Sequence, residues 1–344
     1  MSSKRKRIII ITIRVVLAII LTTVAILIIV GNSKKDRSAP TEELSNWQSM
    51  IIDQTRIKDM VIAGAHDAGT AGLPYFAATQ DRSTIDLLEC GTRYLDLRVS
   101  YAKGKLLIYH GPSKGVALAD VLDEVKQFIT AHNTENVILD FQHFDEKDTE
   151  AQLGAIEMTE SVLDGLLIAN DTNLTDVEFI DSLTLEQARG KCLVVWGREN
   201  EDVLNKSYVF KRNNDGGTRT DSVIHSYYTG SLNKKSSSKY ISVALPAYIN
   251  KYKEENCGLF VLQGQLTDGL FVFGPQFREA THTDKMNRYL DSLKQSDDLQ
   301  YINIVIRDFI SPAKNCHTIQ LNMDKGIVDE NYLDQFRKMI EDNM

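Results

Sequence analysis

Two histidines, an arginine and two aspartates stand in short blocks of the sequence that are otherwise apolar or small. His66 and Asp67 lie side by side in VIAGAHDAGT. Asp96 and Arg98 lie two residues apart in RYLDLRV, and His110 ends KLLIYH. Histidine can take or give a proton near neutral pH, and the planar guanidinium of arginine binds phosphate through two N–H groups. These residue types could cleave a phosphodiester, with one histidine as base, the other as acid, and the arginine neutralising the phosphate oxygens.

Each of these residues also has a structural interpretation, because most buried polar groups simply find hydrogen-bonding partners. His66 could cap a turn, and Asp96 with Arg98 could be a structural ion pair. The spacing of Asp96 and Arg98 favours a shared functional position, since side chains two residues apart on a strand point to the same face. If the apolar residues between them face surrounding helices, Asp96 and Arg98 point into the interior of a barrel near its mouth. The small residues around His66 would let a substrate approach the backbone closely.

The elements that position these residues follow from the hydrophobic pattern. Short apolar runs rich in β-branched residues alternate with segments whose apolar residues recur every three or four positions. Continuous apolar strands separated by helices are typical of a parallel sheet covered on both faces. The pattern predicts an α/β fold with a closed (β/α) barrel, although an open doubly wound sheet fits it too. The expected strands are 60–64, 93–99, 105–110, 136–142, 191–197, 259–264 and 302–309, and the expected helices are 116–133, 150–170, 242–256 and 284–295.

The chain begins with a basic segment, residues 1–7, and then an apolar one, residues 8–30, interrupted by Arg14 and three threonines. As a helix the apolar segment would be about 34 Å long, enough to cross a hydrocarbon layer of about 30 Å. A cleaved signal peptide is the alternative, but its apolar region is usually shorter and GNS is a poor cleavage site. We therefore expect an uncleaved transmembrane signal anchor with a cytoplasmic N-terminus, a linker (31–45) and one extracellular catalytic domain (46–344).

Charge and cysteine content exclude some functions. The first 37 residues hold eight lysines and arginines and one aspartate, which leaves 31 basic and 46 acidic residues in the rest of the chain. A nucleic-acid partner is therefore not expected, because phosphate backbones require clustered positive charge. The four cysteines are widely spaced without a CxxC pair, so a zinc site is not expected either. The disulfide pattern stays open, and the chain is expected to be monomeric.

Four blocks of the sequence, IAGAHDAGT, GTRYLDLRV, YHGP and ENVILDFQHF, occur in an order and at spacings that resemble the X domain of phosphatidylinositol-specific phospholipases C. The likeness is to the bacterial enzymes and the X-domain-only proteins, within the superfamily of phospholipase C-like phosphodiesterases. LFVLQGQLT and NIVIRDFI resemble later blocks, so the match runs from about Trp47 to Asp308. The resemblance implies a distorted TIM-type barrel that cleaves the head group of phosphatidylinositol-type lipids. In that family the inositol 2-hydroxyl attacks the phosphorus, and diacylglycerol and a cyclic inositol phosphate are formed.

The resemblance also assigns roles to the residues that match the family's motifs. His66 corresponds to the general base and His110 to the general acid. Asp67 corresponds to the carboxylate that partners the acid. Arg98 corresponds to the residue that stabilises the phosphate, and Asp96 to the acidic residue beside that arginine.

One further catalytic residue, two substrate-binding candidates and the cofactor requirement complete the expected site. In the family a carboxylate late in the chain orients the base, and Asp308, after the last apolar run, is the candidate. Gln142 is expected to face the barrel interior and bind substrate with Arg98. The tyrosine pair Tyr227 and Tyr228 in HSYYTG could stack on the inositol ring, because aromatic faces bind sugar-like C–H surfaces, and Tyr227 is the one expected to bind substrate. Calcium-dependent relatives carry carboxylate and amide ligands where the bacterial enzymes have this arginine, so Arg98 implies that no metal or other cofactor is needed.

Two other functions fit parts of the pattern. One is a metal-dependent phosphodiesterase acting on glycerophosphodiesters or sphingolipids from the same barrel. It would need a cluster of acidic ligands near the first histidine, where only Asp67 and Asp96 are found. The other is a non-catalytic surface protein that binds a lipid or a partner, since a fold does not dictate chemistry. The retained set of His66, His110 and Arg98 argues against that alternative. A membrane phospholipid, phosphatidylinositol or a related lipid, is the expected partner.

Overall fold

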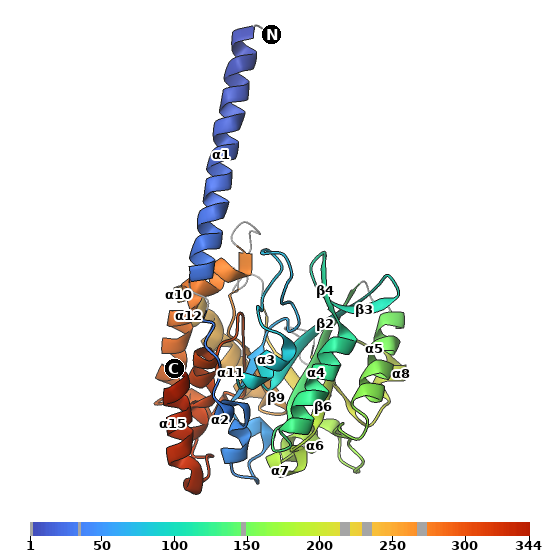
Figure 1. Cartoon of the computed structure of the whole chain (residues 1–344). Helices are drawn as coiled ribbons and strands as arrows, with labels where there is room; N and C mark the ends of the chain where they lie inside the picture. Colours follow the sequence, from blue (N-terminus) through green and yellow to red (C-terminus); the bar gives the residue numbers. More distant parts are fainter. Residues whose placement is uncertain (1–2, 34–35, 146–148, 214–220, 229–235, 267–273) are drawn as a thin grey trace.

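A ring of parallel strands forms the body of the molecule (Figure 1). The computed structural model describes residues 3–33, 36–145, 149–213, 221–228, 236–266 and 274–344. Each neighbouring pair in the order β7-β6-β5-β2-β1-β10-β9-β8 is parallel. The bounds of these strands are β1 Ile62–Ala65, β2 Tyr94–Ala102, β5 Val137–Phe144, β6 Cys192–Trp196, β7 Val209–Lys211, β8 Ile224–Ser226, β9 Leu259–Gln263 and β10 Ile304–Arg307.

The two edge strands of this ring meet. A single parallel bridge joins Arg212, just after β7, to Ile224 on β8. Two backbone hydrogen bonds flank it, from Val223 N–H to the Lys211 carbonyl at 2.8 Å and from Asn213 N–H to the Ile224 carbonyl at 3.0 Å. The barrel is thus nearly closed, which confirms the predicted TIM-type fold and excludes the open doubly wound sheet.

One predicted barrel strand, residues 105–110, is not part of the ring. As β3 (Lys105–His110) it pairs antiparallel with β2 and with β4 (Ser113–Ala117), in a hairpin beyond the barrel (Figure 1). The reversal follows from the two-residue turn Lys103–Gly104, in which both residues have positive φ, 54° and 75°. Such a turn matches the twist of a tight antiparallel hairpin. The prediction of a buried parallel strand at this position was wrong. An apolar run does not reveal whether the strand pairs parallel or antiparallel with the neighbouring strand.

Helices cover the outside of the barrel, and the four helices predicted from the sequence are present with shifted ends. The segment 150–170 stops being helical at Val162, before Gly165 with its left-handed φ of 74°. The segment 284–295 is the second half of a helix that begins at Gly274. The helices are α2 Glu42–Ser45, α3 Thr84–Glu89, α4 Leu118–Ala131, α5 Thr149–Val162, α6 Asp176–Ser182, α7 Leu185–Ala188, α8 Glu201–Leu204, α10 Ser237–Lys239, α11 Leu245–Glu255, α12 Gly274–Leu293, α13 Pro312–Ile319, α14 Leu321–Asp324 and α15 Leu333–Asn343.

The side chains of β2 divide between the two faces of the barrel wall as predicted. Leu95, Leu97 and Val99 are buried in a cluster with residues of α4 and α5 outside the wall. Asp96 and Arg98 therefore point inward. Trp47 belongs to a different cluster, with inward-facing residues of the ring, so the interior is filled with side chains and is not a pore. The four cysteines are unpaired, and Cys90, Cys192 and Cys316 are buried.

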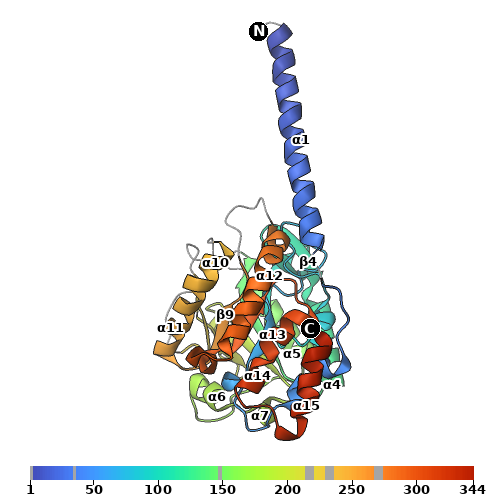
Figure 2. The same ribbon diagram turned by 90° about the vertical axis from the view of Figure 1, so that its left-hand side faces the viewer.

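The N-terminal helix α1 (Ser3–Ser33) projects from the barrel (Figures 1 and 2). Its segment Arg7–Gly31 contains an 18-residue stretch with a mean hydropathy of 2.9 and is long and apolar enough to cross a membrane or to serve as a signal sequence. Almost all of its large apolar side chains are exposed, from Ile8 at 56% to Ile29 at 66%. Only its last turns contact the barrel, where Leu27 is buried.

Candidate active site

The parallel pairing of three strands brings most of the predicted site residues to one end of the barrel. His66 and Asp67 follow β1 directly, Arg98 lies on β2, and Asp308 follows β10. In the β1–β10 pair Ala65 lies opposite Arg307, so the next residues, His66 and Asp308, are also neighbours. His110 reaches the same place from the β3–β4 hairpin. The six residues predicted to be catalytic are thus gathered at the carboxyl ends of the strands, where barrel active sites lie.

His66 makes contacts with both of its ring nitrogens. Nδ1–H donates to Asp308 Oδ1 at 2.7 Å, so Nε2 faces the cavity. In the neutral ring Nε2 accepts from Arg98 Nη2 at 3.2 Å, and in the protonated ring it faces Asp67 Oδ2 at 3.5 Å. Burial alone would lower the pKa of His66, but the charges of Asp67 and Asp308 outweigh it and raise this pKa from 6.5 to about 9.

Asp67 lies at the centre of the group, with a fully buried carboxylate. Its Oδ1 is ion-paired with Arg98 Nε, and its Oδ2 lies 3.5 Å from Nε2 of His66 and 3.5 Å from Nε2 of His110. Burial acts to raise the pKa of Asp67, but Arg98 and the two histidines keep it below its usual value. Asp67 thus places one carboxylate between the two imidazole rings.

Asp67 holds an unusual backbone conformation, with a φ of 46°. Its carbonyl accepts hydrogen bonds from Thr70 Oγ1 at 2.8 Å and Thr79 Oγ1 at 3.3 Å. Gly69, at φ 79°, continues the left-handed turn, and a Cβ there would lie 3.0 Å from Ile108. The small residues after His66 are therefore required by a tight turn packed against the hairpin, in addition to any access they give to a substrate.

His110 has a fixed ring orientation. Its Nδ1–H donates to the carbonyl of Ala77 at 2.7 Å, which leaves Nε2 facing Asp67. The side chain is 27% exposed, compared with 12% for His66. A proton on Nε2 of His110 is thus held toward the cavity by the Asp67 carboxylate.

Asp96 is the second buried carboxylate of the group. Its Oδ2 lies 3.5 Å from Arg98 Nη2 and 4.0 Å from His66 Nε2, and it accepts from the backbone N–H of Asp67 at 3.4 Å. Burial raises the pKa of Asp96, and the negative charge of Asp67 adds to this effect. The contact with the N–H of Asp67 supports the backbone that carries this neighbouring carboxylate.

A cavity of about 190 Å³ opens between these side chains. Gln142, predicted to bind substrate, lies on its wall and accepts from Arg98 Nη2 at 3.2 Å. Four further polar residues for which the sequence suggested no firm role also lie on it. The wall comprises His66, Arg98, His110, Gln142, His143, Tyr228, Gln263 and Gln265.

Tyr227 does not reach this cavity, which corrects the expected stacking on a ring of the substrate. Its side chain is 1% exposed and packs outside the barrel wall, with its ring 6.0 Å from that of Phe260 and Lys251 Nζ 4.4 Å above it. Tyr228 lines the cavity instead. Successive residues of an extended segment point to opposite sides, so choosing the wrong tyrosine of the pair placed the contact outside the barrel.

Gln80 is a supporting residue that sequence reasoning missed. Its side-chain amide donates to the carbonyls of His66 at 2.8 Å and Arg307 at 2.9 Å, and its Oε1 accepts from Ile310 N–H at 3.0 Å. These bonds tie together the two strand ends that carry His66 and Asp308. No motif marks it, because its partners are distant backbone groups.

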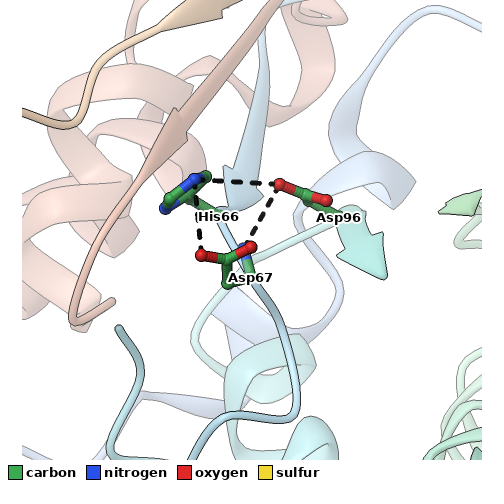
Figure 3. A group of neighbouring side chains, drawn as sticks. All are labelled: His66, Asp67 and Asp96. Atoms are coloured by element: carbon green, nitrogen blue, oxygen red, sulfur yellow. Dashed lines mark hydrogen bonds and ion pairs between the residues drawn. The ribbon is translucent and has the colours of Figure 1, made fainter. Parts of the chain in front are cut away.

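Three of the site residues could also hold a cation. The ligand atoms of His66, Asp67 and Asp96 all lie within 4.8 Å of one another (Figure 3). The guanidinium of Arg98, however, already pairs with both carboxylates. A metal ion would compete with this guanidinium, so the three residues fit a cation only if Arg98 moves away from them.

Comparison with known proteins gives a consistent result for the central part of the chain. Residues 55–197 match the family model for the X domain of phosphatidylinositol-specific phospholipase C. The 1-phosphatidylinositol phosphodiesterase of Listeria monocytogenes is 35% identical over 102 residues, 27% of this chain and 31% of that protein. The enzyme of the same name from Staphylococcus aureus is 22% identical over 178 residues, 47% of this chain and 54% of that protein. The chain thus spans about half or less of the length of these relatives.

Solved structures extend the likeness to most of the barrel. The phosphatidylinositol-specific phospholipase C of Listeria monocytogenes has a TM-score of 0.61 at 20% identity, over 81% of this chain and 98% of that one. A structure of the Staphylococcus aureus enzyme has a TM-score of 0.59 at 17% identity, over 88% of this chain and 98% of that one. At this identity the likeness concerns the fold. Residues 55–197 of this chain are thus similar to the X domain of phosphatidylinositol-specific phospholipases C, as its sequence blocks predicted.

Proposed function

We propose that this chain is a membrane-anchored phosphodiesterase that cleaves the head group of phosphatidylinositol-type lipids without a metal ion. The observation that carries the proposal is the convergence of His66, His110 and Arg98 on one cavity, where all three face the buried carboxylate of Asp67. The relatives named as phosphatidylinositol phosphodiesterases support the choice of substrate class.

In the proposed reaction His66 Nε2 takes the proton of the attacking inositol hydroxyl. Asp308 fixes the tautomer by accepting from Nδ1–H, so the free lone pair is the one that faces the cavity. The carboxylates that raise the pKa of His66 to about 9 make its neutral form scarcer at pH 7 but more basic. A stronger base abstracts a hydroxyl proton more readily, which compensates in part for the smaller neutral fraction.

On the other side of the phosphorus His110 gives a proton to the leaving glycerol oxygen. Its Nε2–H is held toward the cavity by Asp67 while Ala77 fixes Nδ1. Arg98 binds the non-bridging oxygens, and its planar donors are suited to two oxygens at once. Attack by a neighbouring hydroxyl yields a cyclic inositol phosphate and diacylglycerol, and the bond that breaks is the one to the glycerol oxygen.

The helix α1 is proposed as an uncleaved anchor, with residues 1–7 cytoplasmic, 8–30 in the membrane and the catalytic domain 46–344 outside. Its exposed apolar surface is what a lipid-facing helix requires, since a soluble helix would bury one face. The proposal for the complete chain is then a single-pass membrane protein that acts as a monomer on a lipid substrate.

A metal-dependent phosphodiesterase is the second candidate, favoured by one observation. His66, Asp67 and Asp96 present three ligand atoms within 4.8 Å of one another. The ion pair of Arg98 with Asp67 argues against it, because a cation bound there would repel the guanidinium.

The test uses the full chain in detergent micelles containing phosphatidylinositol, with and without excess EDTA, and analyses the water-soluble product. We expect a cyclic inositol phosphate at the same rate in both samples. Loss of turnover in EDTA, restored by calcium or magnesium, would instead support the metal-dependent enzyme. Binding of the lipid without any soluble product would support the non-catalytic alternative.

Two substitutions with a control complete this test. His66→Ala and His110→Ala should each lower turnover by about 100-fold or more, the usual contribution of a general acid or base. His132→Ala is the matched control, because that histidine bonds Asn46 at the far end of α4 and does not line the cavity. Unchanged turnover in either site variant would remove that histidine from the mechanism.

A further inference from the structure

The last turns of α1 are docked on the barrel. Leu27 is 6% exposed, whereas Ile26 and Ile29 beside it are 54% and 66% exposed. Tyr75 Oη donates to the carbonyl of Leu27 at 3.4 Å. One turn later Gly31 packs on α12, where a Cβ on Gly31 would lie only 3.0 Å from Gln276 Cγ. Contact with the barrel therefore begins inside the apolar segment Arg7–Gly31, without a free spacer between them.

This docking site lies at the same end of the barrel as the catalytic cavity. Tyr75 belongs to the segment that follows the carboxyl end of β1, and α12 begins after the carboxyl end of β9. Figures 1 and 2 show α1 leaving the barrel at the end that carries the β3–β4 hairpin and the start of α12. The cavity is lined by residues from these same carboxyl ends, including His66 and Gln263.

Exposed apolar side chains also occur on the elements at this end of the barrel. Phe76 is 45% exposed, and its ring meets that of Tyr75 edge to face with 5.1 Å between centroids. Tyr101 and Val116 are exposed on the hairpin strands, and Val243 is 47% exposed just before α11. Aromatic side chains of this kind are favoured at the boundary between lipid and water. Because Tyr75 contacts Leu27, Phe76 lies level with the end of the membrane-spanning segment.

From these contacts we infer that the end of the barrel that holds the cavity rests on the membrane through which α1 passes, so that the chain takes its lipid from that membrane and not from another one. The inference rests on the proposed function and deepens it. The occupant of the exposed apolar side chains at this end, above all Phe76, is the bilayer itself, because the contact of Tyr75 with Leu27 holds Phe76 beside the point where the helix leaves the hydrocarbon.

The docked segment also carries part of the catalytic site. Two residues after Tyr75, the carbonyl of Ala77 accepts from His110 Nδ1 at 2.7 Å. Three residues further on, Gln80 donates to the carbonyl of His66 at 2.8 Å. The same short segment thus joins α1, the lipid surface and both catalytic histidines. Lipid would enter the cavity beside the anchor, with its head group near the histidines and its acyl chains still in the membrane.

The test uses two populations of lipid nanodiscs. Unlike vesicles, nanodiscs have no lumen, so every barrel is exposed to the solution. One population contains the full chain and phosphatidylinositol with one isotopic label, and the other lacks protein and contains phosphatidylinositol with a second label. We expect release of diacylglycerol from the protein's own discs to be on the order of 100-fold faster, because a tethered site acts at a high effective concentration of substrate. Dilution should slow hydrolysis in the protein-free discs only.

The outcomes separate the inference from the function on which it rests. Equal rates for the two labels would overturn the inference and leave the enzyme intact. Faster hydrolysis in the protein-free discs would also overturn it. Absence of both diacylglycerol pools, with the protein folded, would contradict the proposed function itself.

A matched pair of substitutions tests the apolar surface directly. Phe76→Asp places a charge where the inference puts lipid, and Leu174→Asp does the same at a leucine that is also 45% exposed but lies in the segment before α6. Phe76→Asp should slow hydrolysis in the protein's own discs about tenfold, since a charge weakens interfacial binding. It should leave turnover of a monomeric short-chain phosphatidylinositol within twofold. Equal effects of the two substitutions on bilayer substrate would refute a lipid contact at Phe76.

Discussion

Replacing His66 should change how the stability of the barrel depends on pH. The pKa of His66 is raised from 6.5 to about 9 in the folded chain, against the effect of burial, by the charges of Asp67 and Asp308. A raised pKa means that the folded state holds the proton more tightly than the unfolded state does. The stabilisation from this proton is complete below pH 6.5 and is lost as the pH rises through about 9.

The size of the effect follows from the shift. The difference between 6.5 and about 9 corresponds to about 3 kcal/mol, since each unit is worth about 1.4 kcal/mol. The side chain of His66 is 12% exposed, so screening by solvent reduces this figure little. The contribution of His66 to the free energy of unfolding should therefore fall by about 3 kcal/mol between pH 6.5 and 9.5. It is measured as the difference between the wild type and His66→Asn, because Lys325, whose pKa is lowered by burial to about 8, titrates in the same range with the opposite sign.

Urea unfolding of the full chain in detergent at several pH values measures this difference. The chain has two tryptophans, Trp47 and Trp196, and both are buried in the barrel, so their fluorescence reports barrel unfolding and not α1. Asp308→Asn should reduce the slope without abolishing it, because Asp67 still raises the pKa of His66. His132→Asn serves as the control histidine outside the cavity. A wild-type slope in His66→Asn would refute the assignment of the proton to this residue.

Three other results are expected. Asp67→Asn should lower the pKa of His66, so the limb of the kcat/KM profile that reports the ionisation of His66 should move below about 9. It should also reduce turnover at least 100-fold, and kinetics from pH 5 to 10 would record both effects. Tyr228→Ala should raise KM for phosphatidylinositol severalfold, whereas Tyr227→Phe should leave KM unchanged, because only Tyr228 lines the cavity. Gly64→Ala should destabilise the barrel by about 1–3 kcal/mol in urea unfolding, since its Cβ would lie 2.8 Å from Ile306 Cγ2 and 3.0 Å from Tyr94 Cδ1.

The barrel could be predicted because most of its strands are continuous apolar runs of at least four residues. β5, β6 and β9 each have a fully or almost fully buried pattern, which only a sheet covered on both faces produces. β7 and β8 were missed because each has three residues, too few to show a periodicity. Because β7 and β8 complete the ring, its closure could not be derived from the hydrophobic pattern of the sequence.

The candidate site could be predicted in part because parallel strands end at a common edge. Polar residues after apolar runs, such as His66 and Asp308, are then neighbours whatever their separation in the chain. Side-chain direction beyond a strand end does not follow from this rule, and Tyr227 was therefore chosen in place of Tyr228. His110 was placed correctly although its strand was assigned wrongly, because the hairpin folds back over the same edge.

Backbone conformation explains how the two carboxylates reach one imidazole. Asp67 and Phe309 are two of the four described non-glycine residues with left-handed φ, at 46° and 48°. Such a conformation costs about 1 kcal/mol or more per residue and persists only where other contacts hold it. Thr70 and Thr79 bond the Asp67 carbonyl, while Lys314 Nζ donates to the Phe309 carbonyl at 2.8 Å.

These two strained residues lie on either side of His66. Each follows a strand end and turns the chain sharply. At the first turn the carboxylate of Asp67 itself points back to the imidazole of His66. At the second turn the carboxylate of Asp308, the residue before Phe309, does the same. Phe309 N–H also donates to the Thr79 carbonyl at 2.7 Å, so the two turns are bonded to one another. A substitution that relaxes one turn, such as Thr79→Val, should therefore disturb both carboxylates together and lower the pKa of His66, which a histidine NMR titration would detect.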